Sequence, residues 1–126
     1  MSSFLKNIDH ITILTDNLNS TINFYTKILD LKTADWRPRF SFSGAWLAID
    51  NNAIIHLIEV KKMPSNSGNI DHFALQGKNI KQFKRKLKKQ KTRFYEKVTP
   101  DNTIQQIFIT DPNNIKIEIT FKTLIN

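Results

Sequence analysis

Four side chains of the kinds that bind metal ions recur at fixed spacings in this chain. They are His10, His56, His72 and Glu118, and they include every histidine in the sequence. The differences 56 − 10 and 118 − 72 are both 46, and 72 − 10 and 118 − 56 are both 62. Imidazole nitrogen with carboxylate oxygen suits Zn, Ni, Mn, Fe or Co, whereas Ca and Mg prefer oxygen ligands alone. The pattern therefore predicts one divalent metal ion held by residues related in pairs.

The offset of 62 is an internal repeat of the sequence. Ile-Asp-His occurs at 8–10 and again at 70–72, and the segment 46–57 aligns with 108–119 without a gap, matching an Asn-Asn pair in each. Self-similarity at a fixed period indicates repeated structural units. We therefore expect two copies of one unit, each supplying two of the four candidate ligands.

Hydrophobic periodicity predicts the same order of elements in both copies, a strand and a helix followed by three strands. Asp16 or Asn17 and later Asn79 are the candidate helix caps, and the Asn-Asn pairs are expected in hairpin turns because Asn tolerates the left-handed backbone conformation. The first copy is predicted as strand 8–14, helix 18–30 and extended segments near 31–36, 41–49 and 53–59; the second as strand 70–75, helix 80–90 and strands 92–97, 103–110 and 115–121. This is an α+β fold of two tandem βαβββ modules, about 8–62 and 70–122, joined by the turn-rich segment 63–69.

Alternation of side chains along a strand assigns the candidate ligands to faces. Glu118 lies on the face opposite Ile117 and Ile119, and His56 and His10 follow the same rule in the first module. If the modules pack about a pseudo-twofold axis, the four ligands meet near that axis. Five further residues are predicted to bind substrate: Trp46 and Phe108 as aromatic walls, and Arg37, Arg39 and Lys116 for an acidic group.

Composition limits the classes of protein to consider. The 126 residues suit a single domain, 1–126, and the absence of cysteine excludes disulfides and thiolate ligands. The net charge of +8 arises largely from nine of the 19 basic residues, which lie in 78–93, where apolar residues keep helical spacing. This indicates a solvated helix face and argues against nucleic acid as a partner. Neither a membrane-spanning run nor a secretory signal is visible, so we expect a cytoplasmic protein with no membrane partner.

Three segments of the chain resemble the vicinal oxygen chelate superfamily, which includes glyoxalase I, extradiol dioxygenases and bleomycin resistance proteins. They are IDHITILTDNLNSTINFYTKILDL, the later IDHFAL and the closing FITDPNNIKIEI. RPRFSFSGAWL followed by IIHLIE is similar to a branch of short glyoxalase-like proteins. The resemblance implies a curved, mostly antiparallel sheet cup, and its metal positions fall on His10, His56, His72 and Glu118. His56 departs from the pattern, because glyoxalase I typically has Glu there.

Function is implied by the resemblance as a ranked set of hypotheses. The first is a metal-dependent lyase or isomerase of the glyoxalase I type, acting on a small α-oxo or α-hydroxy carbonyl compound such as a glutathione adduct, with Glu118 as ligand and catalytic base. The second is a ferrous extradiol-type dioxygenase in which His56 does not bind the metal. The third is a non-catalytic protein that sequesters a drug or metabolite. A homodimer is expected in each case.

Overall fold

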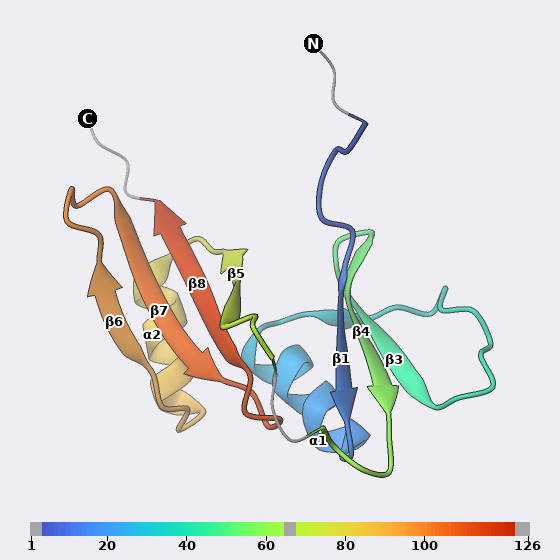
Figure 1. The fold of residues 1–126 in the computed structure, drawn as a ribbon. Helices are drawn as coiled ribbons and strands as arrows, with labels where there is room; N and C mark the ends of the chain where they lie inside the picture. Colours follow the sequence, from blue (N-terminus) through green and yellow to red (C-terminus); the bar gives the residue numbers. More distant parts are fainter. Residues whose placement is uncertain (1–3, 65–67, 123–126) are drawn as a thin grey trace. The chain divides into compact units, whose positions relative to one another are not determined.

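The structure, a computed structural model, describes residues 4–64 and 68–122. The chain divides into two compact units, Met1–Met63 and Pro64–Asn126. Each unit contains a strand, a helical segment and three further strands in that order (Figure 1). The predicted α+β fold of two βαβββ modules is therefore confirmed. Part of the segment predicted as the linker, residues 65–67, lies outside the described residues.

The first unit forms a four-stranded mixed sheet with one helical segment. Its elements are β1 (Ile11–Thr15), α1 (Leu18–Asn23), the π-helical turn η1 (Phe24–Ile28), β2 (Lys32–Thr33), β3 (Gly44–Ile49) and β4 (Asn52–Glu59). The strand order is β1-β4-β3-β2, in which β1 and β4 are parallel and the other two pairs are antiparallel. The first and last strands of the unit are therefore neighbours, with β1 at the edge of the sheet and β4 inside it.

The second unit repeats this topology. Its elements are β5 (His72–Gln76), α2 (Ile80–Lys89), β6 (Tyr95–Val98), β7 (Ile104–Thr110) and β8 (Lys116–Lys122). The strand order β5-β8-β7-β6 has the same pattern of one parallel and two antiparallel pairs. In both units the strands predicted to carry metal ligands are adjacent, because the first strand pairs with the last.

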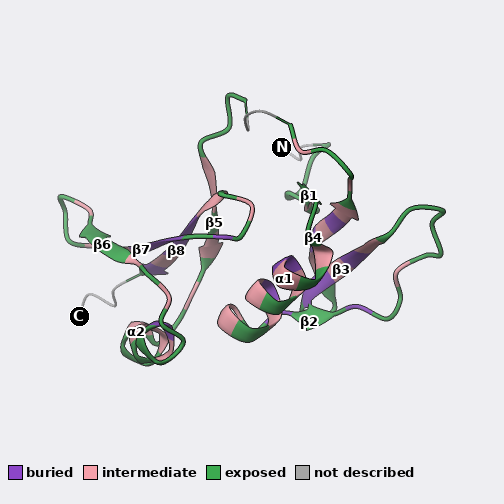
Figure 2. Ribbon diagram, turned by 90° about the horizontal axis from the view of Figure 1, so that it is seen from below, coloured by how far each residue is buried: buried purple, intermediate pink, exposed green. Residues whose placement is uncertain are grey.

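Each sheet buries one apolar face under its helical segment. In the first unit Leu47, Ile55 and Leu57 are almost completely buried, as is Tyr25 of η1. In the second unit Ile107, Ile117 and Phe121 are buried, and α2 covers this face through Leu87 and through a Phe83–Phe121 ring contact at 5.8 Å (Figure 2). The alternation of side chains therefore leaves His56 and Glu118 on the faces away from the helices.

The helix predicted over 18–30 is shorter than the periodicity indicated. Asn17 caps α1 as predicted, accepting a hydrogen bond from the Ser20 amide at 3.1 Å. Beyond Asn23 the chain widens into η1, where the Thr26 hydroxyl bonds to the Ile22 carbonyl at 2.8 Å. Threonine hydroxyls compete for carbonyls in this way and loosen the α-helical ladder. Asn79 precedes α2 but makes no side-chain cap, because its backbone adopts the left-handed conformation.

Several strand boundaries also differ from the prediction. β1 and β5 begin at Ile11 and His72, later than expected at 8 and 70, and β3 begins at Gly44 rather than 41. The segment 31–36 contains only the two-residue strand β2. The hairpin after β7 uses Asn114 in the left-handed conformation, as predicted, but in the hairpin after β3 that conformation falls on Asp50 instead of the Asn-Asn pair. Aspartate shares with asparagine the short polar side chain that tolerates it.

No helix in residues 4–64 and 68–122 is long and apolar enough to cross a membrane.

The loop between β6 and β7 is closed by one carboxylate. Asp101 accepts hydrogen bonds from the hydroxyls of Thr99 and Thr103 at 2.7 and 2.8 Å and from the Thr103 amide at 3.1 Å. The Thr99 bond, followed by the Thr103 bonds, lowers the pKa of Asp101 below its ordinary value. A carboxyl whose pKa is lower in the folded state stabilises the fold above its unfolded pKa, and that contribution is lost as the pH falls through the folded pKa.

We therefore expect Asp101→Asn to lower the free energy of unfolding at neutral pH, with the difference from wild type shrinking as the pH falls through the acid range. Urea unfolding at a series of pH values measures this difference, and NMR titration locates the carboxyl pKa. Asp50→Asn, in the hairpin after β3, is the matched control. A difference that grows on acidification would contradict the assignment of Asp101.

Candidate metal centre

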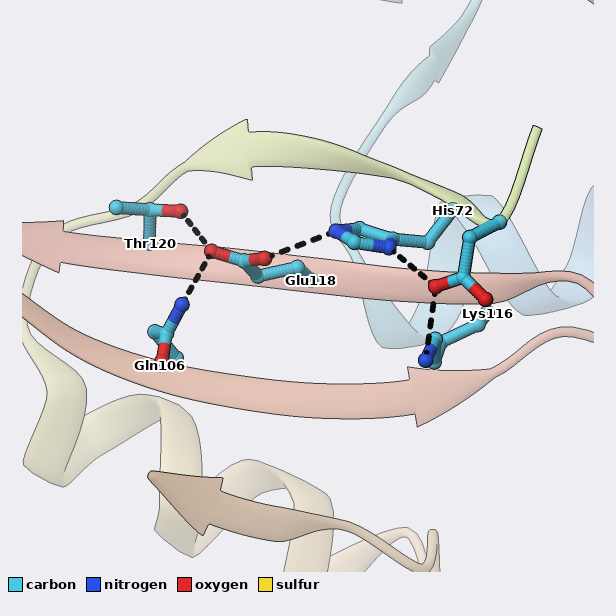
Figure 3. A network of polar contacts seen from close by, with 6 residues as sticks. His72, Gln106, Lys116, Glu118 and Thr120 are labelled. Atoms are coloured by element: carbon cyan, nitrogen blue, oxygen red, sulfur yellow. Dashed lines mark hydrogen bonds and ion pairs between the residues drawn. The ribbon is translucent and has the colours of Figure 1, made fainter. Parts of the chain in front are cut away.

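The second unit brings His72 and Glu118 into contact. His72 is the first residue of β5, and Glu118 lies in the middle of β8, the neighbouring parallel strand. The Nε2 atom of His72 lies 3.1 Å from Oε1 of Glu118, while its Nδ1 atom lies 2.7 Å from Oδ2 of Asp71 (Figure 3). The imidazole is therefore held between two carboxylates. A ring nitrogen donates to a carboxylate only where it bears a proton, and a cation bound at Nε2 would take the place of that proton.

Glu118 is a buried carboxylate with a full set of hydrogen-bond donors. Only 8% of the residue is exposed. Its Oε2 atom accepts from the Thr120 hydroxyl at 2.8 Å and from the Gln106 amide at 3.1 Å (Figure 3). Burial acts to raise the pKa of Glu118, but the bonds from Thr120, Gln106 and His72 outweigh it and the pKa is lowered. Glu118 thus stays charged at neutral pH, as a metal ligand must.

Removing the hydrogen bond from either Thr120 or Gln106 should make the charged form of Glu118 less stable. We expect Gln106→Ala and Thr120→Val each to raise the pKa of Glu118, because each takes away a hydrogen bond to the charged form. NMR titration of the side-chain carboxyl in chelator-treated protein measures the shift. Gln105→Ala, the neighbouring residue on the opposite face of β7, serves as control, and an unchanged pKa in both test variants would show that the two donors are incidental.

An aspartate orients the imidazole of the first-strand histidine in each unit. Asp9 contacts Nδ1 of His10 at 2.7 Å, as Asp71 contacts Nδ1 of His72 at the same distance. A carboxylate on one ring nitrogen directs the other nitrogen toward a metal and raises its basicity. Sequence reasoning missed both aspartates, although they are part of the repeated Ile-Asp-His. Strand parity would point neighbours to opposite faces, but Asp9, His10 and Asp71 precede the strands, where parity does not apply.

In the first unit the two candidate ligands are both histidines, and their rings stack. The rings of His10 and His56 are 3.7 Å apart with 12° between their planes, and Trp46 stacks on the other side of His56 at 4.0 Å and 9°. Trp46 and His56 are direct partners across β3 and β4. Burial, and then the neighbouring His10, lower the pKa of His56. His56 is therefore a neutral imidazole at neutral pH, the form that binds metals.

The two pairs fit a metal ion to different degrees. Two atoms bound to one first-row ion at about 2.1 Å and at right angles lie about 3.0 Å apart, and the 3.1 Å between His72 and Glu118 matches this spacing. Parallel stacked rings cannot aim both lone pairs at one point, so His10 and His56 must tilt to share an ion. Within the described parts of the chain, no group of three or more His, Asp or Glu residues is arranged to hold a metal.

The residues predicted to bind substrate lie on the ligand-bearing faces or in the loop before β3. Phe108 is the direct partner of Glu118 across β7 and β8, as Trp46 is of His56. Lys116 bonds to Asp71 at 2.9 Å, and this bond raises the pKa of its ammonium group. Arg37 folds back on its own loop, bonding to the Phe42 carbonyl at 3.2 Å with its guanidinium 5.0 Å from the Phe40 ring. Arg39 is exposed.

Residues 7–119 match the family described as the Glyoxalase/Bleomycin resistance protein/Dioxygenase superfamily. The chain therefore belongs to this superfamily, and the resemblance noted in the sequence is confirmed. Members of this class differ in activity, so membership leaves the reaction open.

Among individual proteins, the chain is 26% identical over 123 residues to "Glyoxylase I 4" of Arabidopsis thaliana, covering 91% of this chain and 70% of the relative. The glyoxylase/bleomycin resistance protein/dioxygenase domain of Frankia sp. EAN1pec has a similar structure, with a TM-score of 0.78 at 18% identity, covering 97% of this chain and 96% of that one. Lactoylglutathione lyase of Agrobacterium tumefaciens matches with a TM-score of 0.71 at 12% identity, covering 94% and 96%. At these identities the two structures establish the fold alone.

Proposed function

We propose that the chain is a metal-dependent enzyme of the glyoxalase type, a lyase or isomerase acting on a small α-oxo or α-hydroxy carbonyl compound such as a glutathione adduct. The observation that carries this proposal is the line Asp71–His72–Glu118, in which an oriented imidazole meets a buried, charged carboxylate at the spacing of two metal ligands. The names of the Arabidopsis and Agrobacterium proteins support the same class of reaction. The proposed substrate is a small molecule, whether it is an α-oxo or an α-hydroxy compound.

The proposed ligands are His10, His56, His72 and Glu118, with one divalent ion (Zn, Ni, Mn, Fe or Co) for each set. The bound ion supplies Lewis-acid polarisation of a substrate carbonyl. An ion held by these four protein ligands would still have room for neighbouring oxygens of the substrate. This favours isomerase-type chemistry over reactions that also bind oxygen.

Glu118 is the proposed group that takes a proton from the substrate and returns it. Its hydrogen bonds from Thr120 and Gln106 make it a weak base while they are intact. Proton transfer by Glu118 therefore requires that at least one of these bonds lengthen when substrate binds. Trp46 and Phe108, the strand partners of His56 and Glu118, are the proposed walls for the apolar part of the substrate. Arg37 and Arg39 are proposed contacts for its acidic group.

The test combines metal content with turnover. Protein purified without a metal-binding tag is analysed for elements, stripped with chelator and reloaded separately with Zn, Ni, Mn, Fe or Co. Conversion of the methylglyoxal–glutathione adduct is followed for each form. Turnover restored by at least one metal and lost in His72→Ala supports the proposal. Protein that binds none of the metals, or binds them without converting the adduct, argues against a glyoxalase reaction.

A ferrous extradiol-type dioxygenase is the second candidate, and the stacking of His56 favours it. His56 is sandwiched between Trp46 and His10 and has no orienting carboxylate among its described contacts. Without His56 the set becomes His10, His72 and Glu118, the two-histidine, one-carboxylate arrangement of non-haem iron oxygenases. Oxygen consumption by iron-loaded protein with a panel of catechols would favour this reaction. Turnover that survives His56→Ala would agree with it.

Assembly and location follow from the same proposal. A single ion bound by all four residues requires the two pairs to come together, either within one chain or between two copies, and we expect a homodimer with two sites. Light scattering that finds only monomers would exclude ligands shared between chains. We expect the enzyme to act in the cytoplasm. If the protein takes up no metal, and the variant with His10 and His72 replaced by Ala still binds an aromatic compound tightly, a sequestering protein is favoured instead.

A further inference from the structure

The ligand-bearing face of the second sheet also carries an aromatic pair. Registers of β6, β7 and β8 place Tyr95, Phe108 and Glu118 side by side on this face. The rings of Tyr95 and Phe108 stack with centroids 4.9 Å apart and 14° between their planes. Phe108 is 7% exposed, whereas Tyr95 is 49% exposed. The pair therefore offers an accessible aromatic surface next to the candidate metal ligand.

Two ammonium groups flank this aromatic pair. Nζ of Lys97 lies 5.9 Å from the centroid of Tyr95 and 5.8 Å from that of Phe108, and Nζ of Lys116 lies 5.9 Å from that of Phe108. Lys116 is neutralised by Asp71, which also holds His72. No ion pair is found for Lys97 in the described part of the chain. One positive charge next to the aromatic pair is therefore available for a ligand.

The first unit repeats the fold but has other residues at two of these strand positions. Ile54 stands in the place of Lys116, because the two positions are related by the repeat offset of 62. Ala34 stands in the place of Tyr95. Its amide bonds to the carbonyl of Trp46 at 2.8 Å, and Trp46 is the residue that repeats Phe108, the strand partner of Tyr95. Packing of the sheet thus requires neither a lysine at the position of Lys116 nor a ring at the position of Tyr95. In the first unit the ring and the cation near Trp46 are Phe40 and Arg37 from the loop before β3, whereas in the second unit the strands themselves place the ring and the lysines beside the candidate ligand.

We propose that Lys97, Lys116 and the Tyr95–Phe108 pair form a subsite for a planar carboxylic acid, so that the substrate is an aryl-substituted α-oxo or α-hydroxy acid. The ring of the ligand lies against Tyr95, and its carboxylate contacts the ammonium of Lys97, with Lys116 beside it. This rests on the proposed function in placing the reactive oxygens at His72 and Glu118. A planar ring is selected by stacking, and the negative charge is selected by the unpaired lysine.

The test uses phenylglyoxylate and its neutral amide as probes of the full-length chain in the presence of chelator. Titration calorimetry is expected to show the acid binding more tightly than the amide. Lys97→Met should weaken binding of the acid about fivefold, the upper range for a partly exposed ion pair, and leave the amide unchanged. Tyr95→Leu should weaken both. Lys88→Met, which removes one charge from an exposed position of α2, should change neither and controls for net charge.

Circular dichroism and thermal unfolding confirm that each variant is folded before its binding is compared. Equal binding of acid and amide by the wild type, binding of neither, or an equal loss of both in Lys97→Met would overturn the subsite. Acid preference without any metal binding would keep the subsite and reject the metalloenzyme. Metal-dependent turnover of a neutral adduct, without a preference for the acid, would keep the metalloenzyme and reject the subsite.

Discussion

Replacing Glu118 by glutamine is expected to lower the affinity of the protein for Zn²⁺ by about 100-fold or more, since even residues that only orient a ligand change affinity by about 10- to 100-fold. Glutamine keeps the shape of the side chain and can still accept a hydrogen bond from Thr120. It removes the negative charge that the burial and hydrogen bonding of Glu118 maintain. The effect on metal binding therefore isolates charge from packing.

Competition with a chromophoric chelator measures this affinity in both proteins. Glu96→Gln is the matched control, because it removes one carboxylate charge from the same sheet. Glu96 pairs with Lys84 of α2 at 3.1 Å and lies on the opposite face from Glu118. We expect its Zn²⁺ affinity to match wild type. If Glu118→Gln bound Zn²⁺ as tightly as Glu96→Gln does, Glu118 would not be a ligand. The proposed metal site would then lose its only carboxylate.

The order of strands and helices along the chain was predictable in both units, because a gapless repeat constrains two copies at once. One offset of 62 aligned the first strands, the last strands and the hairpins, so that weak signals in one copy were supported by the other. Parity then placed His56 and Glu118 opposite Leu57 and Ile117, which are buried as expected. Both predictions depend on regular strands, in which sequence spacing translates directly into geometry.

What sequence spacing missed lies where the chain departs from regular strands or where contacts are tertiary. Asp9 and Asp71 orient histidines from positions just before β1 and β5, where alternation carries no information. Gln106 reaches Glu118 from another strand, and its role depends on the pairing of β7 with β8. The stacking of His10 on His56 is likewise invisible in spacing. It distinguishes two units that share one fold.

The two units hold their candidate metal ligands by different contacts. In the second unit, His72 and Glu118 are in direct contact at 3.1 Å, and Asp71 holds the other ring nitrogen of His72 at 2.7 Å. In the first, the neutral His56 is held by aromatic contacts that contribute about 0.5–1.5 kcal/mol per pair beyond burial. An ion bound by all four residues would have to open that stack, whereas an ion bound by His10, His72 and Glu118 alone would leave it intact. His56 is therefore the residue that separates the two candidate reactions.

Gly44→Ala is expected to lower the free energy of unfolding by roughly 3 kcal/mol, near the upper end for crowding in a packed region. A Cβ atom at Gly44 would lie 2.1 Å from the Leu57 carbonyl oxygen and 3.0 Å from Nη2 of Arg37. The first contact involves the backbone of β4, so β3 and β4 must separate to relieve it. Gly44 precedes Trp46 on the ligand-bearing face, and the separation would disturb the Trp46–His56 stack as well.

Urea unfolding followed by Trp fluorescence measures this loss, and thermal unfolding should show a midpoint lower by roughly 10 °C for a chain of this size. Ser43→Ala is the control, since Ser43 is exposed and its carbonyl, which accepts from the Glu59 amide at 2.9 Å, is retained. Its stability should stay within about 0.5 kcal/mol of wild type. Equal stability of the two variants would mean that β3 and β4 are not as close at Gly44 as the structure has them, and the pairing of Trp46 with His56 would need revision with it.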